Sequence, residues 1–252
     1  MKSKPLLLFL FLTLFSRVAL AQASVATSDN KDSPLFSGAS LEKQYYASFP
    51  VHPELFNGPE YMDYSKKYFK REGHQFFESP DKQRGTIYYT NHFFENVQLI
   101  YDVVTDKLIL QHPTTPLLLS LINERVEYFT IAKHRFIRLA DDSAVAKVIS
   151  TGYYEVLVDN KVQLLARRSK QMQEKIETSH INIEFYLNDK LFLKKGGIYY
   201  PINNKRAIVN LLSDREAELK AYSKANKLRF KKSRREADIM QLTEYYCSLA
   251  SR

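Results

Sequence analysis

The middle of the chain consists of short apolar runs separated by turn-forming residues. The clearest case is residues 152–168, GYYEVLVDNKVQLLARR, in which runs rich in Tyr, Val and Leu flank the pair Asp159–Asn160. Asp and Asn accept the positive φ that a two-residue hairpin loop requires. This stretch therefore predicts two antiparallel strands joined by a tight turn.

The same turn pattern occurs three times, as VTDKLIL at 104–110, VDNKVQL at 158–164 and LNDKLFL at 187–193. An internal repeat is one interpretation. Repeat architectures have a fixed period, whereas these copies begin 54 and 29 residues apart. The unequal spacing favours independent use of one turn chemistry in an antiparallel meander.

Residues 81–202 predict about ten strands with short connections, as antiparallel neighbours allow. Gly196–Gly197 is a further two-residue turn. Two stretches interrupt the pattern, residues 140–151 and the polar run 169–179, which is either a mobile hairpin tip or a helical turn. The candidate strands are 86–90, 96–104, 107–111, 125–131, 135–139, 153–158, 161–167, 181–187, 191–194 and 198–202.

Residues 203–252 predict two or three helices, because the apolar period changes after Pro201. Asn203–Asn204 can cap the first helix, which ends near Leu212, and S-x-x-E capping boxes at 213–216 and 233–236 begin the next two. One apolar stripe in the last helix is fit to dock on a sheet; it contains Ile239, Leu242, Tyr246 and Leu249.

Residues 35–80 are rich in aromatic side chains and interrupted by Pro and Gly, which predicts an irregular cover over the sheet. A platform for glycans or for side chains of a partner is the alternative for Tyr45 to Phe77. The absence of Trp weakens that alternative. The expected fold is α+β, with a mainly antiparallel meander sheet of about ten strands and two or three C-terminal helices.

The first residues have the features of an export signal. Lys2 and Lys4 precede an apolar run at 5–15, and Ala19–Leu20–Ala21 provides small residues for cleavage before Gln22. An uncleaved N-terminal anchor is the alternative. Because the only Cys is Cys247, a lipoprotein is not expected. Residues 1–21 thus predict a signal peptide of a periplasmic or secreted protein, and the polar residues 22–34 a flexible mature N-terminus.

The chain is basic, with a net charge of +9, and cleavage would remove three cations to leave +6. Such a charge favours contact with anionic surfaces. One segment places six cations within nine residues, which predicts an anion-binding or partner-binding site. A solvated loop is the alternative. The six residues are Lys227, Arg229, Lys231, Lys232, Arg234 and Arg235.

Three stretches resemble a group of uncharacterised exported proteins of Bacteroidota-type bacteria. They are residues 97–110, with QLIYDVVTDKLIL at their centre, GGIYYPINNK at 196–205, and KKSRREADIMQLTEYYCSL from Lys231. The resemblance covers about the last two thirds of the chain. It implies an exported compartment and no particular activity.

Chemical motifs are scarce. The six histidines are at least 18 residues apart, so none forms a local metal-binding pair, and no phosphate-cradling loop or nucleophile elbow is present. No cofactor or metal is expected, and Cys247 is expected to be a small buried residue. A hydrolase site assembled from scattered His and Asp residues is the alternative hypothesis.

The leading functional hypothesis is a noncatalytic binding or scaffold protein of the bacterial envelope. Its partner would be an envelope protein, a glycan or an anionic surface, and no nucleic acid is expected. An exposed edge of the sheet could also recruit a strand from a partner.

Overall fold

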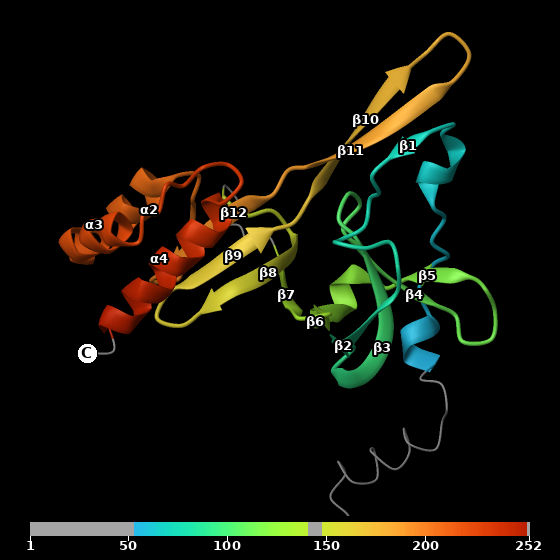
Figure 1. Cartoon of the computed structure of the whole chain (residues 1–252). Helices are drawn as coiled ribbons and strands as arrows, with labels where there is room; N and C mark the ends of the chain where they lie inside the picture. Colours follow the sequence, from blue (N-terminus) through green and yellow to red (C-terminus); the bar gives the residue numbers. More distant parts are fainter. Residues whose placement is uncertain (1–52, 141–147, 251–252) are drawn as a thin grey trace, which may run out of the picture. The chain divides into compact units, whose positions relative to one another are not determined.

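The structure, a computed structural model, describes residues 53–140 and 148–250, all within one unit of the chain, Val51–Arg252. It confirms the α+β fold. A ten-stranded antiparallel sheet, a three-stranded sheet and three C-terminal α-helices make up the described part (Figure 1). The expected signal peptide, the flexible segment and the first part of the aromatic cover lie outside the described residues.

The large sheet is a meander with two departures. Strand β6 lies beside β2 rather than beside β5, and β9 lies beside β12 because the chain between them forms a second sheet. In spatial order the strands are β13 (Ile198–Pro201), β12 (Lys190–Lys195), β9 (Gln163–Arg167), β8 (Gly152–Asp159), β7 (His134–Leu139), β6 (Val126–Ile131), β2 (Gln83–Tyr89), β3 (His92–Asp102), β4 (Lys107–Gln111) and β5 (Leu118–Ser120).

The predicted turns have different outcomes. Gly196 and Gly197 form the expected two-residue loop, with φ of +58° and +82°. In the clearest predicted hairpin, however, Asp159 lies opposite Gln163. The loop therefore contains residues 160–162, one residue more than expected. A register shift between Val156 and Val158 accompanies it.

The third copy of the turn pattern, residues 187–193, does not form a hairpin. Leu187 ends β11 (Ile181–Leu187), which pairs with β10 (Lys170–Ile176) and with β1 (Arg71–Glu72) in the small sheet. Lys190, by contrast, begins β12 of the large sheet. The two turn formers Asn188 and Asp189 connect the sheets, because local turn chemistry does not determine which strands pair.

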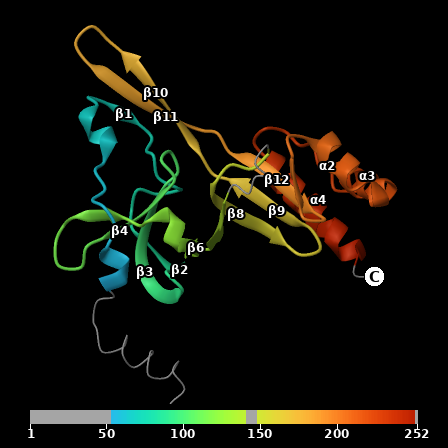
Figure 2. The same ribbon diagram turned by 180° about the vertical axis from the view of Figure 1, so that it is seen from behind.

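Strands β9 to β12 form one long two-stranded ribbon that passes from the large sheet into the small one. Arg167 lies opposite Lys190 before the passage and Lys170 opposite Leu187 after it, so the register is unchanged. The two antiparallel strands β10 and β11, here called the β10–β11 ribbon, extend away from the large sheet in both views (Figures 1 and 2). The two chain segments that connect the large sheet to the small one are Arg168–Ser169 and Asn188–Asp189, and we call them the passage.

Four clusters of buried side chains hold the described part together, and two of them are much larger than the others. One large cluster combines aromatic and aliphatic side chains and lies on β2 to β8, where the rings of Phe129 and Phe136 stack 4.8 Å apart. The other lies between β8, β9 and β12 and the C-terminal helices α2 (Lys205–Leu211), α3 (Glu216–Ala225) and α4 (Arg235–Ala250).

The predicted stripe of α4 docks in the second cluster, where Ile239, Leu242 and Tyr246 are buried. Leu249 is only half buried. Full burial of one such aliphatic side chain stabilises the fold by about 1.5–3 kcal/mol. Cys247 is buried as well.

Among the described residues, no helix has the length and hydrophobicity needed to cross a bilayer.

The helix starts were predicted in part. The Asn204 side chain accepts a hydrogen bond from the Ala207 amide at 2.9 Å and caps α2, as expected. The prediction of two capping boxes was wrong. Ser213 begins a 3₁₀ turn, η4 (Ser213–Arg215), so Glu216 is the first residue of α3 rather than its third. Glu236, at the start of α4, binds Arg168 instead of the backbone.

The described part of the aromatic N-terminal segment has little regular structure. It contains the 3₁₀ turns η1 (Pro53–Phe56) and η2 (Tyr64–Lys67); a third, η3 (Asn123–Arg125), precedes β6. Tyr61, Tyr68, Phe76 and Phe77 are buried. The Tyr61 hydroxyl donates to the buried Asp102 carboxylate at 2.8 Å, which ties this segment to the end of β3.

Candidate functional site

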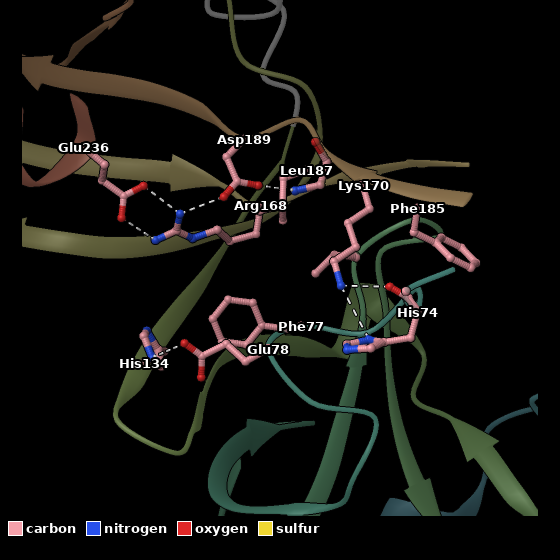
Figure 3. Close-up of a pocket in the computed structure, with 13 residues that line it drawn as sticks. His74, Phe77, Glu78, His134, Arg168, Lys170, Phe185, Leu187, Asp189 and Glu236 are labelled. Carbon is pink, nitrogen blue, oxygen red and sulfur yellow. Dashed lines mark hydrogen bonds and ion pairs between the residues drawn. The ribbon is translucent and has the colours of Figure 1, made fainter. Parts of the chain in front are cut away.

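A cavity of about 540 Å³ lies at the base of the β10–β11 ribbon, and we call it the ribbon-base cavity (Figure 3). It receives residues from the segment that follows β1, from the residue that follows β3, from the start of β7, from the chain at 168–170 and 185–189, and from α4. Its lining is Gly73, His74, Phe77, Glu78, Val103, His134, Arg168, Ser169, Lys170, Phe185, Leu187, Asp189 and Glu236.

Arg168 joins three segments of the chain at this cavity. Its Nη1 donates to Asp189 Oδ2 at 2.8 Å, and its Nη1 and Nη2 donate to the two Glu236 oxygens at 2.7 and 2.8 Å. Its Nε donates to Glu155 Oε2 at 2.5 Å. Such planar, bidentate pairing is characteristic of guanidinium with carboxylate. Arg168 therefore ties the passage in the ribbon both to the large sheet and to α4.

His134 extends this network on the opposite side of Glu155. Its Nδ1 lies 2.5 Å from Glu155 Oε1, and its Nε2 lies 3.2 Å from Glu78 Oε1. The ring also meets Phe77 edge to face, with centroids 5.0 Å apart. The buried Glu155 carboxylate thus has both oxygens occupied, one by His134 and one by Arg168.

Lys170, the first residue of β10, is also held by the protein. Its Nζ donates to the carbonyl oxygens of His74 and Phe76 at 2.8 and 2.6 Å and lies 3.4 Å from His74 Nδ1. Figure 3 shows the side chains of Lys170 and His74 pointing toward one another. Two neutral acceptors and a histidine therefore surround this ammonium, and no carboxylate contacts it among the described residues.

Burial and charge shift several pKa values here in ways that follow from these contacts. Burial opposes the charge on Arg168, but hydrogen bonding to Glu236 and the charge of Glu155 outweigh it and raise the pKa. Burial lowers the pKa of Lys170. Burial, followed by the nearby charge of Lys170, lowers the pKa of His74.

The groups of the cavity that remain available to a ligand are hydrogen-bond acceptors, so the ligand should be a hydrogen-bond donor. Its cations, Arg168 and Lys170, already have partners. Glu78 and Glu236 keep side chains that are 51% and 39% exposed, so carboxylate oxygens remain accessible. Phe77, Val103, Phe185 and Leu187 provide apolar surface. The cavity can therefore hold a cationic group that has an aliphatic or aromatic stem.

The structure places the six predicted cations around the loop between α3 and α4. Four of them, Lys227, Arg229, Lys231 and Arg234, line one cavity of about 460 Å³ with Asn226, Ser233 and Asp238. We call it the basic cavity. Lys232 is exposed and Arg235 half buried, and neither lines this cavity.

Sequence reasoning missed the ribbon-base cavity, since its five charged residues come from separate positions between 78 and 236. Two of the six histidines, His74 and His134, meet there. His52 lies outside the described residues. In residues 53–140 and 148–250, no cluster of three or more His, Cys, Asp or Glu side chains has an arrangement that could hold a metal ion.

Comparison with protein-family models, with curated proteins and with solved structures found no match to this chain.

Proposed function

We propose that the chain is a noncatalytic binding protein of the bacterial envelope that holds an extended segment of a partner protein along β10. The observation that carries the proposal is an edge strand. Among the described residues, β10 has a strand neighbour on one side only, because the small sheet has the order β1, β11, β10. Unpaired edges of this kind bind partner strands by adding them to the sheet.

The pairing of β10 with β11 identifies the backbone groups at the open edge. The Asn188 amide donates to the Ser169 carbonyl at 2.9 Å, and the Glu177 amide donates to the His180 carbonyl at 2.9 Å. These opposed residues are hydrogen-bonded pairs, which alternate along an antiparallel ladder. The intervening residues of β10 therefore direct their amide and carbonyl groups away from β11; they are Lys170, Met172, Glu174 and Ile176.

The side chains of those residues share one face with alternate residues of β11, and this face is apolar at both ends. Ile176 and Leu187 are 80% and 77% exposed, and Met172 and Ile181 are partly exposed. At the centre the Tyr68 hydroxyl donates to Glu174. Exposed apolar side chains gathered beside an open edge favour a protein partner over solvent.

Charge at the base of the ribbon favours a basic residue in that partner. Leu187 and Phe185 of the ribbon face also line the ribbon-base cavity, where Glu78 and Glu236 keep accessible oxygens. A Lys or Arg side chain could pack its stem on the apolar lining and place its charge at these carboxylates. The proposed occupant is therefore an extended segment with alternating apolar residues and one basic residue.

A peptide-display selection against the purified protein tests this proposal. It is expected to enrich extended sequences that contain Lys or Arg, and a synthetic peptide of the enriched kind is then titrated against two variants. Met172→Pro removes one amide at the open edge without removing a bond to β11, and it should weaken binding about tenfold or more. Met172→Ala, the matched control, keeps that amide and should weaken binding much less.

Equal weakening by both variants would attribute binding to the side chain and contradict strand addition. Selection of no peptide, or of peptides without basic residues, would contradict the proposed occupant. Thermal unfolding of each variant verifies that the ribbon is folded, since both substitutions lie at an edge.

A second candidate, hydrolysis, is favoured by the contact between His134 Nδ1 and Glu155 at 2.5 Å. A buried carboxylate that fixes a histidine ring is the arrangement of a general base. His134 Nε2 would have to leave Glu78, 3.2 Å away, to accept a proton from water. Hydrolysis of aryl esters that is lost in His134→Asn would support this candidate, and no hydrolysis by the unaltered protein would remove it.

A further inference from the structure

We propose that the basic cavity binds a phosphate monoester, as a lipid head group or as a soluble molecule. This inference does not rest on the proposed strand-binding function. It starts from the loop between α3 and α4, in which cationic and apolar residues alternate. Lys227, Arg229 and Lys231 are exposed, whereas Leu228 is buried and Phe230 half buried.

The alternation explains how the cations gather. Leu228 anchors the loop in the cluster under the helices, and Phe230 packs against the same cluster. The residues on either side of these anchors are therefore directed outward together, and all three line the basic cavity. Arg234, just before α4, is the fourth cation of the lining.

Asp238 holds this loop in place without neutralising it. Its buried carboxylate accepts hydrogen bonds from the Arg229 and Phe230 amides at 3.1 and 2.7 Å through a single oxygen, Oδ2. The other oxygen lies 3.9 Å from Arg234 Nε, which is a weak ion pair because the Arg234 side chain is 74% exposed. The anchoring of the loop thus depends on backbone amides and leaves the cationic side chains available.

The charge of the cavity is therefore not compensated. Within the described residues, the side chains of Lys227, Arg229 and Lys231 have no ion pair, and Arg234 has only the long contact to Asp238. In the ribbon-base cavity, by contrast, Arg168 contacts three carboxylates. Four cations gathered against one engaged carboxylate repel each other, and a bound anion would relieve that repulsion.

The types of side chain favour a phosphate monoester. Arg229 and Arg234 bring two guanidinium groups, whose planar forks match phosphate oxygens, and Lys227 and Lys231 add point charges. Asn226 and Ser233 of the lining add neutral donors. A monoester phosphate carries close to two negative charges at neutral pH. The volume of about 460 Å³ leaves room for the group that the phosphate is attached to.

The distribution of charge would bring such ligands to this part of the molecule. Residues 203–252 contain 12 Lys and Arg against six Asp and Glu, whereas residues 53–202 contain 20 against 19. The excess charge of residues 53–252 therefore lies almost entirely in residues 203–252. Long-range attraction of anionic ligands or surfaces acts through such a region.

Two double variants of the purified protein test the proposal. Lys231→Gln with Arg234→Gln removes one Lys and one Arg from the lining. Lys232→Gln with Arg235→Gln removes the same charges from the same segment outside the lining. Binding is measured with glycerol phosphate by calorimetry, and by co-sedimentation with phosphatidylcholine vesicles that contain phosphatidic acid or, in equal proportion, phosphatidylglycerol.

The lining variant should weaken binding of a monoester probe about tenfold or more, and the control variant about threefold or less. Binding of glycerol phosphate would identify a soluble source. Absence of glycerol phosphate binding, together with stronger binding to phosphatidic acid vesicles than to phosphatidylglycerol vesicles, would identify a lipid source. Equal weakening by both variants, equal binding of the two vesicle types without glycerol phosphate binding, or binding of no probe would overturn the proposal.

Discussion

The two cavities beside the first turn of α4 use charged residues in opposite ways. Glu236 of this turn binds Arg168 in the ribbon-base cavity, and Asp238 binds loop amides in the basic cavity. In the first cavity the protein itself supplies the partners of each cation. In the second, the single carboxylate fixes the backbone and the cations are left to solvent. The same kinds of residue therefore stabilise the fold at one site and are available to a ligand at the other.

The largest expected effect of breaking this contrast is at Arg168. Arg168→Met removes the shared partner of Glu155, Asp189 and Glu236, and Glu155 is buried. Glu155 would keep only His134. Removing one partner of a buried ion pair costs about 3–5 kcal/mol, so the free energy of unfolding should fall by about that amount. Urea unfolding followed by circular dichroism measures it.

Arg168→Lys is the control for this prediction. It keeps the charge but cannot serve three carboxylates with one ammonium, so its loss should be smaller than that of Arg168→Met. A loss of less than about 1 kcal/mol in Arg168→Met would show that the network contributes little to stability.

The contrast also explains which site could be predicted from the sequence. The six cations of residues 227–235 lie close together in the chain, so counting charges along the sequence is enough to find them. The Arg168 network joins residues 155, 168, 189 and 236, and nothing local marks them as neighbours. The adjacent pair Arg167–Arg168, at the end of a predicted strand, was a weak signal that the strand pattern changes there.

The prediction of the fold was likewise restricted to features that are visible locally in the sequence. The strand at 107–111 was predicted with its observed bounds, because apolar residues dominate it and a turn precedes it. Strand β10, KQMQEKI, lies in the run 169–179, which was assigned to a tip or a helical turn because it is mostly polar; in the structure the strand is mainly exposed. A strand in a ribbon that is covered only in part need not alternate in polarity, since neither face must be buried throughout. The strand that carries the proposed function was therefore among those that the pattern of apolar residues failed to predict, together with the short strands β1 and β5.

A smaller effect, on pH dependence, should sharpen the contrast. Burial and Lys170 lower the pKa of His74 in the folded protein, so the unfolded chain binds protons more readily there. Stability should therefore fall as the pH drops from about 6.5 through the lowered pKa of His74. The basic cavity has no histidine in its lining and should not contribute in this range.

His74→Gln isolates this contribution. Melting temperatures of the unaltered protein and the variant, measured between pH 5 and pH 8, should differ in slope, with the variant losing less stability toward acid. Parallel curves would contradict a role of His74. A steeper curve in the variant would show that protonated His74 stabilises the fold.

The smallest expected effect on the free energy of unfolding is at the basic cavity, where removal of cations should not destabilise the fold. Lys231→Gln with Arg234→Gln should leave the free energy of unfolding unchanged or raise it by up to about 0.5 kcal/mol, because like charges are removed and only one long ion pair is lost. Any gain should shrink at high salt, since exposed charges are screened within a few ångströms there. Urea unfolding at low and high salt measures both. A loss comparable to that of Arg168→Met would mean that these cations are held by the fold rather than kept free for an anion.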